Sequence, residues 1–301
     1  MMVLFQNKII YMPSVPPFSR SETVSEYARQ CQPVTWTEHD LRAVDGTALT
    51  LLEGTIDSKA NVPVKEHVVV LYLQGNASSL PPRLPYLSRV LKSAHDSESS
   101  DRQYTIVALS YRGYWKSKGS PSQTGIELDV EAALDWIFHR YEPDKTKVVV
   151  WGQSIGAGAA TIGLANLSRK SDGSLSRIAG VVLETPFVDL KAMLIALYPQ
   201  KFLPYRYLSP FLLSRWDSQT ALHEIAKAKP DLSILILEAG DDEIVPAGQA
   251  AILEEVCHKQ GITVERKVVP GALHTEVMTK GQGRNHIVKF LRWVGEPKTA
   301  Q

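Results

Sequence analysis

The sequence has 301 residues, of which 44% are hydrophobic, and 33 Lys and Arg stand against 32 Asp and Glu, for a formal net charge of +1 at pH 7. This length allows one large α/β domain with a covering insertion, or two ordinary domains, and the hydrophobic fraction fits a well-buried core. A near-zero net charge gives no reason to expect nucleic acid binding or strong electrostatic attachment to anionic membranes. The composition therefore favours a neutral or locally recognised ligand.

Two cysteines, Cys31 and Cys257, form neither a metal cluster nor a dense disulfide framework, and a single disulfide between them stays open. The apolar start of the chain is interrupted by Gln6, Asn7 and Lys8, so it is too short for a spanning helix and is a poor signal peptide. No later segment approaches about 20 uninterrupted apolar residues. We expect a soluble protein of the cytoplasm, free or peripheral to a membrane.

The first predicted elements are two strands joined by a tight turn. Residues 34–38 and 47–52 flank Asp45-Gly46, a pair that tolerates positive φ and favours an antiparallel hairpin over a surface loop. Short β-branched runs typical of strands buried on both faces follow at 67–74, 104–110, 147–152, 178–184, 233–238 and 263–269. Helical patterns lie between them at 124–141, 155–167, 248–260 and 281–294. This alternation predicts an α/β fold with a mostly parallel sheet and flanking helices.

The pattern changes over residues 187–222, which are rich in aromatic residues and prolines and contain no buried-strand run. We expect a small helical cap insertion there. Its apolar side chains fit an acyl chain or a lipid surface, and they fit simple packing on the core equally well. Segments 93–102 and 168–177 are typical of solvated loops. The predicted organisation is an N-terminal arm (1–33), one core domain (34–186 and 223–295), the cap insertion (187–222) and a tail (296–301).

The segment KVVVWGQSIGAGAATIGLANL indicates a buried strand, a tight turn and a helix, with Ser154 at the turn. A serine at the tip of a strained strand-to-helix turn leaves no room for side chains two positions away, where Gly152 and Gly156 stand. The N-terminus of the following helix favours developing negative charge. A dinucleotide or phosphate site fits less well, because Thr161 replaces the third glycine of GxGxxG and no lysine follows. The pattern predicts a nucleophilic serine, with a purely structural turn as the alternative.

A nucleophile of this kind needs an acid and a histidine later in the chain, in that order. The segment SILILEAGDDEIVP places Asp241 and Asp242 just past a buried strand, and the D-x-x-V-P spacing common in this fold favours Asp242. His274 follows the last predicted strand and a Pro-Gly turn, and it precedes a helix. We therefore predict His274 as the general base and Asp242 as the residue that orients it.

A tetrahedral intermediate needs two backbone N–H donors for its oxyanion. One follows the nucleophile, at Ile155. The other is expected from Asn76 in the Gln74-Gly75-Asn76 turn after an early strand, where Gly75 permits close approach of the chain. An ordinary polar turn is the alternative. The remaining candidates, for a substrate pocket, are Gln74, Trp115 and Gln153.

Together these segments resemble the α/β-hydrolase domain (ABHD) serine hydrolases of eukaryotes, especially the monoacylglycerol and lysophospholipid lipase branch. The resemblance runs from about residue 67 to 291 and rests on LYLQGN, SYRGYWKSKGSPSQTGIELDVEAALDWI, WGQSIGAG, LETPF and AGDDEIVP. Gln74 replaces the family's usual histidine and Trp115 a usual glycine, but neither change removes a predicted triad member. The YRG and GSPS stretches have no evident chemical role, and we interpret them as a loop that supports the site.

The resemblance implies cleavage of a carboxylic ester or thioester through an acyl-enzyme, without a metal or cofactor. The implied substrate is a small-molecule or lipid ester such as a monoacylglycerol, a lysophospholipid or an acyl thioester. The membrane anchor of several family members has no counterpart here, so their localisation does not carry over to this sequence. Peripheral contact of the cap with a membrane surface stays open. A peptidase or acyltransferase using the same triad, and a non-catalytic binding or scaffold protein, remain alternatives. The oligomeric state stays open.

Overall fold

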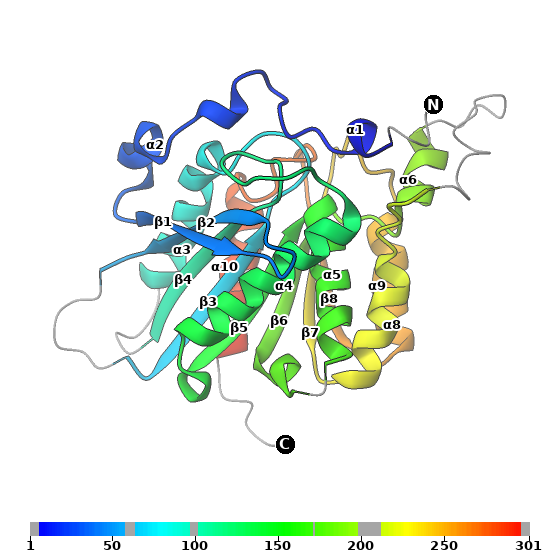
Figure 1. Ribbon diagram of the computed structural model, residues 1–301. Helices are drawn as coiled ribbons and strands as arrows, with labels where there is room; N and C mark the ends of the chain where they lie inside the picture. The colour runs from blue at the N-terminus through cyan, green and yellow to red at the C-terminus, as the bar shows by residue number, and fades with distance from the viewer. Residues whose placement is uncertain (1–5, 58–63, 97–101, 171, 198–211, 296–301) are drawn as a thin grey trace.

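Runs of valine, leucine and isoleucine form the strands of one eight-stranded sheet with helices on both faces (Figure 1). The structure is a computed structural model that describes residues 6–57, 64–96, 102–170, 172–197 and 212–295. Its strands are β1 (Thr35–Arg42), β2 (Ala48–Thr55), β3 (Glu66–Leu73), β4 (Arg102–Ser110), β5 (Thr146–Gln153), β6 (Ile178–Glu184), β7 (Ser233–Ala239) and β8 (Thr263–Val269).

The strands lie in the order β1-β2-β4-β3-β5-β6-β7-β8. β2 runs antiparallel to both β1 and β4, and all other neighbours are parallel. The mostly parallel sheet predicted from the sequence is therefore confirmed, and so is the opening hairpin. At its turn Gly46 has a φ of 81°, and the Thr47 N–H donates to the Asp45 carboxylate at 3.1 Å.

The helices are α1 (Gln6–Ile10), α2 (Val24–Cys31), α3 (Leu84–Asp96), α4 (Gln123–Arg140), α5 (Ile155–Ser168), α6 (Leu190–Leu197), α8 (Ser218–Ala228), α9 (Gln249–Lys259) and α10 (Gly281–Gly295). Short 3-10 turns lie at Ser19–Ser21, Pro81–Arg83, Pro143–Lys145 and Ser174–Arg177. The helices predicted around α4, α5, α9 and α10 are present within a residue or two of the expected bounds.

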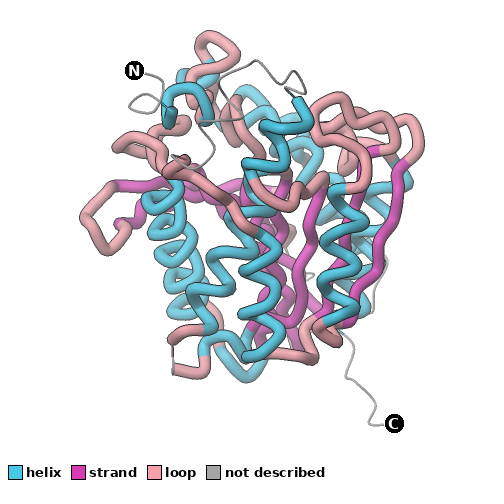
Figure 2. Tube along the Cα trace, turned by 90° about the vertical axis from the view of Figure 1, so that its right-hand side faces the viewer, coloured by secondary structure: helices cyan, strands magenta, loops and turns pink. Residues whose placement is uncertain are grey.

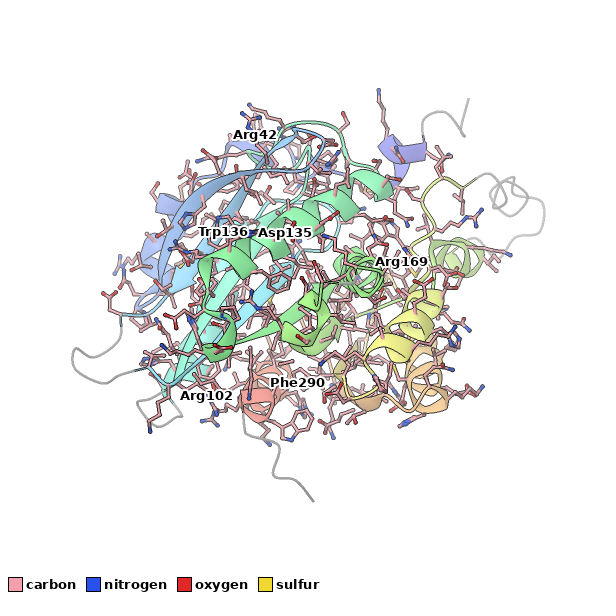
Figure 3. All side chains as sticks on the ribbon, turned by 60° about the horizontal axis from the view of Figure 1, so that its bottom comes forward. Arg42, Arg102, Asp135, Trp136, Arg169 and Phe290 are labelled. Carbon is pink, nitrogen blue, oxygen red and sulfur yellow. The ribbon has the colours of Figure 1, made fainter. Side chains whose placement is uncertain are left out.

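Alternating side chains of the central strands divide the core into two clusters. Val69 and Leu71 of β3 point to the cluster that α4, α5, α8 and α9 complete, whereas Val68 and Val70 point to the cluster with α2, α3 and α10. Figure 2 shows the strands side by side behind the helices that cover one face. Side chains fill the spaces between the ribbons (Figure 3): Phe290 of α10, labelled there, packs where Gly180 of β6 leaves room for it.

Two loop predictions were wrong in part. Of segment 93–102, residues 93–96 form the end of α3 and Arg102 begins β4, because the apolar residues of LPYLSRVLKSAHD recur on one helical face. Of segment 168–177, Ser174–Arg177 is a 3-10 turn whose Leu175 is buried. Residues 97–101 and 171 lie outside the described residues, as do 198–211 of the predicted cap.

The two cysteines are free thiols, since Cys31 packs in one core cluster and Cys257 in the other, on opposite faces of the sheet. The disulfide between Cys31 and Cys257 that the sequence allowed is therefore not formed. Among the described helices, none has the length and apolar character needed to cross a bilayer.

Candidate active site

Ser154 is the single residue between β5 and α5. β5 ends at Gln153 and α5 begins at Ile155, and the serine between them adopts φ 54° and ψ −117°. A non-glycine residue in such a region costs about 1–3 kcal/mol and persists only where its surroundings enforce it. Here the Ser154 N–H donates to the carbonyl of Glu184 at the end of β6, at 2.8 Å.

The glycines around Ser154 are required by close backbone contacts. A Cβ on Gly152 would lie 2.2 Å from the Gly156 carbonyl oxygen, and a Cβ on Gly156 would lie 2.1 Å from the carbonyl oxygen of Leu73 in β3. A Cβ on Gly75 would lie 3.5 Å from the Ser154 Cβ, which places the turn after β3 directly beside the serine. The glycine spacing seen in the sequence thus corresponds to a physical crowding of three backbone segments.

Asp242 and His274 form a hydrogen-bonded pair. The His274 Nδ1 lies 2.9 Å and 3.0 Å from the two carboxylate oxygens of Asp242, and both side chains are less than a tenth exposed. The N–H groups of Ile244 and Val245 also donate to Asp242, at 2.9 and 2.7 Å. The neighbouring Asp241 is exposed. The structure therefore joins the histidine to Asp242, the residue that the spacing favoured.

Opposing effects act on the Asp242 carboxyl. Burial by itself raises its pKa, but the hydrogen bond and charge of His274 and the two backbone N–H donors lower it, and the net pKa is below the usual value. The carboxylate is consequently ionised at neutral pH, as a group that holds a histidine N–H must be.

The topology brings these residues to one edge of the sheet. Ser154 follows β5, Asp242 follows β7 and His274 follows β8, and the carboxyl ends of parallel neighbours lie at the same edge. β3 is the other neighbour of β5, so Asn76 reaches the same place from the opposite side. A cavity of about 90 Å³ borders Asp242 and is also lined by Thr185, Pro186 and Val245, among others.

The two predicted oxyanion donors lie in different backbone conformations, one at a helix N-terminus and one in a loop. Ile155 is the first residue of α5, so its N–H has no partner within its own helix and lies where the helix dipole is positive. Asn76 lies in the loop after β3, which we call the β3 loop (residues 74–79). Ala77 and Ser78, which follow it, have φ of 62° and 61°.

The three candidate pocket residues are buried: Gln74 is 0%, Gln153 1% and Trp115 2% exposed. The Gln153 amide accepts from Arg83 at 2.7 Å and donates to the Glu184 carboxylate at 3.1 Å. The Trp115 indole N–H donates to the carbonyl of Glu22 at 2.7 Å. Their contact with substrate stays a prediction, whereas their role in packing is visible.

Sequence reasoning missed Glu184, whose carboxyl group is fully buried at the end of β6. It accepts hydrogen bonds from the Trp151 indole at 2.9 Å, from Gln153 and from the Met278 backbone N–H at 3.2 Å. Burial raises the pKa of Glu184, and these donors oppose that effect. The side chain links the turn that carries Ser154 to the segment after His274. In the sequence, Glu184 is the last residue of the strand predicted over 178–184 and the second residue of LETPF, and neither pattern indicates its contacts.

Among the described residues, no group of three or more His, Cys, Asp or Glu side chains is arranged to hold a metal ion.

Comparison with known proteins supplies the family. No protein-family model matches the sequence. Protein bem46 of Schizosaccharomyces pombe is 30% identical over 255 residues, which cover 84% of this chain and 75% of that protein. The α/β hydrolase domain-containing protein WAV2 of Arabidopsis thaliana is 26% identical over 256 residues, which cover 82% of this chain and 73% of that protein. This chain belongs to the α/β-hydrolase domain family.

Other proteins are similar over a shorter span of sequence, or in the fold alone. The zebrafish (Danio rerio) lysophosphatidylserine lipase ABHD12 is 32% identical over 187 residues, 60% of this chain and 44% of that protein. Among solved structures, an α/β hydrolase from Vibrio vulnificus superposes with a TM-score of 0.69 at 17% identity, covering 95% of this chain and 92% of that one. The Pyrococcus furiosus esterase Pf2001 superposes with a TM-score of 0.64 at 18% identity, covering 91% of this chain and 95% of that one. Both share the fold described above.

Proposed function

We propose that this α/β-hydrolase is a serine hydrolase that cleaves a carboxylic ester or thioester through an acyl-enzyme. The observation that carries the proposal is the buried pair of His274 and Asp242 at the sheet edge where Ser154 occupies its strained turn. Relatives that are named as a lipase and as esterases support the same reaction class.

In the proposed mechanism the His274 Nδ1–H donates to Asp242, which leaves Nε2 to accept the proton of the Ser154 hydroxyl. The serine oxygen attacks the carbonyl carbon of the substrate. Asp242 stays ionised and stabilises the imidazolium. The N–H groups of Ile155 and Asn76 hold the oxyanion. His274 then protonates the leaving alcohol or thiol as its bond to the acyl carbon breaks. In the second half, His274 takes a proton from water, the water oxygen attacks the acyl carbon, and the proton returns to the Ser154 oxygen as the acid departs.

We further propose a lipid-type ester as substrate, such as a monoacylglycerol, a lysophospholipid or an acyl thioester. Ile244 and Leu273, whose side chains are each 43% exposed, stand two residues after Asp242 and one residue before His274, so the loops that carry the pair also carry exposed apolar side chains. The lysophosphatidylserine lipase among the relatives acts on a substrate of this class, as its name states. Contact of the cap with a membrane surface belongs to this proposal.

Activity-based labelling tests the reaction class. The wild-type protein should react with a fluorophosphonate probe, and Ser154→Ala should abolish labelling. Ser120→Ala, which alters an exposed serine on another loop, should label like the wild type. Labelling that persists in Ser154→Ala would overturn the assignment of the nucleophile.

A substrate panel tests the class of ester. p-Nitrophenyl esters of increasing acyl length, monoacylglycerols, lysophospholipids and acyl thioesters should be hydrolysed with a preference for long chains. Cleavage of peptide substrates or acyl transfer to an added alcohol in place of hydrolysis would favour the alternative uses of the triad. A protein that neither labels nor cleaves any of these esters would favour a non-catalytic binding or scaffold role.

A further inference from the structure

The side chain of Asn76 is held by four hydrogen bonds. Its Oδ1 accepts from the Tyr114 hydroxyl at 2.7 Å, from the Ala77 N–H at 2.9 Å and from the Met12 N–H at 3.0 Å. Its Nδ2 donates to the Ile10 carbonyl at 2.6 Å. Both ends of the amide are therefore fixed, and three of the four partners lie far from residue 76 in the sequence.

Two tyrosines of the loop after β4 hold the β3 loop at two points. The Tyr111 hydroxyl donates to the Gln74 carbonyl at 3.0 Å, and the Tyr114 hydroxyl donates to Asn76. Both tyrosines are 1% exposed, and their rings meet edge to face with centroids 5.9 Å apart. We call this segment the β4 loop (residues 111–122); it contains the YRG and GSPS stretches that the sequence left without a chemical role.

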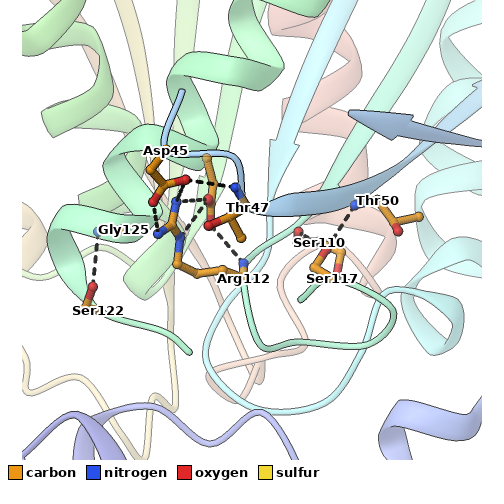
Figure 4. Close-up of polar contacts among 9 residues, drawn as sticks. Asp45, Thr47, Thr50, Ser110, Arg112, Ser117, Ser122 and Gly125 are labelled. Carbon is orange, nitrogen blue, oxygen red and sulfur yellow. Dashed lines mark hydrogen bonds and ion pairs between the residues drawn. The ribbon is translucent and has the colours of Figure 1, made fainter. Parts of the chain in front are cut away.

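The β4 loop is itself rigidly anchored (Figure 4). The Arg112 N–H and Nε donate to the buried carboxylate of Asp129 at 2.8 and 2.9 Å, and Nη1 donates to Asp45 at 2.7 Å. The Ser117 hydroxyl donates to the Ser110 carbonyl at 2.7 Å. Because these contacts tie the β4 loop to α4 and to the opening hairpin, the tyrosines project from a fixed base.

The N-terminal arm is hydrogen-bonded to the β3 loop and to the β4 loop. The Ser78 N–H donates to the Val15 carbonyl at 2.5 Å, and the Arg20 Nε donates to the Trp115 carbonyl at 3.0 Å. Towards the other end of the arm, the Tyr11 hydroxyl accepts from the Trp216 indole at 3.1 Å. Figure 1 shows α1 of the arm and α6 at the same upper end of the molecule. The arm thus connects the β3 loop, the β4 loop and the segment that precedes α8.

We propose that the Tyr114 hydroxyl and the backbone of residues 10–12 position Asn76 so that its own N–H points at the oxyanion. This inference rests on the proposed function. The direction of a backbone N–H is set by its peptide plane, and two residues with positive φ follow Asn76, so the loop needs contacts from outside to keep its conformation. Tyr114 and the arm act through Asn76 and are positioning groups.

Removing a single positioning contact tests this inference. Tyr114→Phe deletes one hydroxyl while Asn76 keeps its N–H and its contacts with Met12, Ala77 and Ile10. A displacement of about 1 Å in an active site costs roughly 100-fold in rate, so a partial loosening should lower kcat about tenfold with KM little changed. Asn76→Ala removes all four side-chain bonds, keeps the backbone donor and should lower kcat about 100-fold.

Two further readouts separate positioning from a loss of stability. A boronic acid that forms a tetrahedral adduct on the serine should bind about tenfold more weakly to Tyr114→Phe, in parallel with kcat. Tyr141→Phe is the matched control. Tyr141 follows the C-terminal end of α4, and the variant deletes its hydroxyl, which is hydrogen-bonded to the carboxylate of Glu53 in β2. It should lower the melting temperature without changing kcat.

The outcomes distinguish the inference from the function on which it rests. A wild-type protein that cleaves esters, together with Tyr114→Phe and Asn76→Ala variants of unchanged kcat and boronate affinity, overturns the inference and leaves the proposed function standing. A wild-type protein that does not react with the fluorophosphonate overturns the proposed function. Equal losses of kcat in Tyr114→Phe and Tyr141→Phe also overturn the inference, because they indicate a general effect of stability.

Discussion

Replacing Gly156 by alanine should harm catalysis much more than it harms the helix that carries the residue. Gly156 and Gly158 both lie in α5, so alanine at either position gains about 0.5–1 kcal/mol of helix propensity. Their surroundings differ. A Cβ at 156 would lie 2.1 Å from the Leu73 carbonyl oxygen and 2.6 Å from that of Gln74, whereas a Cβ at 158 meets its nearest atom, in the Trp216 side chain, at 3.3 Å.

The clash at residue 156 sets the expected magnitude. Backbone atoms at the end of β3 must move by about 1.5 Å to restore an ordinary contact distance, and overpacking of this kind costs about 1–3 kcal/mol. After the gain in helix propensity, the free energy of unfolding should fall by about 0–2.5 kcal/mol. The atoms that move lead directly into the β3 loop, so kcat/KM should fall roughly 100-fold.

Ester hydrolysis and thermal unfolding of both variants check this reasoning. Gly158→Ala should stay within about threefold of wild-type kcat/KM and within about 1 kcal/mol of its stability, because a tryptophan side chain can shift by a few tenths of an ångström. If Gly156→Ala were as active as Gly158→Ala, the close contact between α5 and the β3 loop would not be what positions the site.

Other predictions concern charge and burial. Asp242→Asn should lower kcat about 1,000-fold or more, because His274 loses its orienting carboxylate. Folding lowers the pKa of Asp242, so the wild type should also lose stability relative to this variant as the pH falls below about 4, as measured by urea unfolding. Burial lowers the pKa of His67 from 6.5 to about 4, so the unfolded chain takes up the proton first and stability should decline between pH 6.5 and 4, more steeply than in His67→Gln. Burial raises the pKa of Cys257 to about 12 and also raises that of Cys31, so neither thiol should react with a disulfide reagent in the native protein. Both thiols should react in denaturant. Fast labelling of the folded protein would contradict their burial.

Local patterns predicted those parts of the fold that depend on short stretches of sequence. The hairpin at Gly46 and the parallel strands followed from turn chemistry and β-branched runs, and both are present. Helix α3 was not predicted, because the serine-rich and acidic stretch that directly follows it is typical of a loop and obscures the 3.6-residue period of LPYLSRVLKSAHD. The arm was expected as a separate segment, and nothing in its own residues indicates which loops its carbonyl and N–H groups meet.

In the candidate site, too, some features follow from local sequence patterns and others only from tertiary contacts. The sequence by itself predicted Ser154, Asp242 and His274 as the triad, because a strained turn after a strand demands glycines and a triad in this fold follows a fixed chain order. Only the tertiary structure decided what surrounds them: Asp242 and not Asp241 meets the histidine, Glu184 joins two loops from within the core, and Tyr114 reaches Asn76. These contacts join residues tens of positions apart, and their formation depends on strand order and side-chain packing that no local pattern encodes.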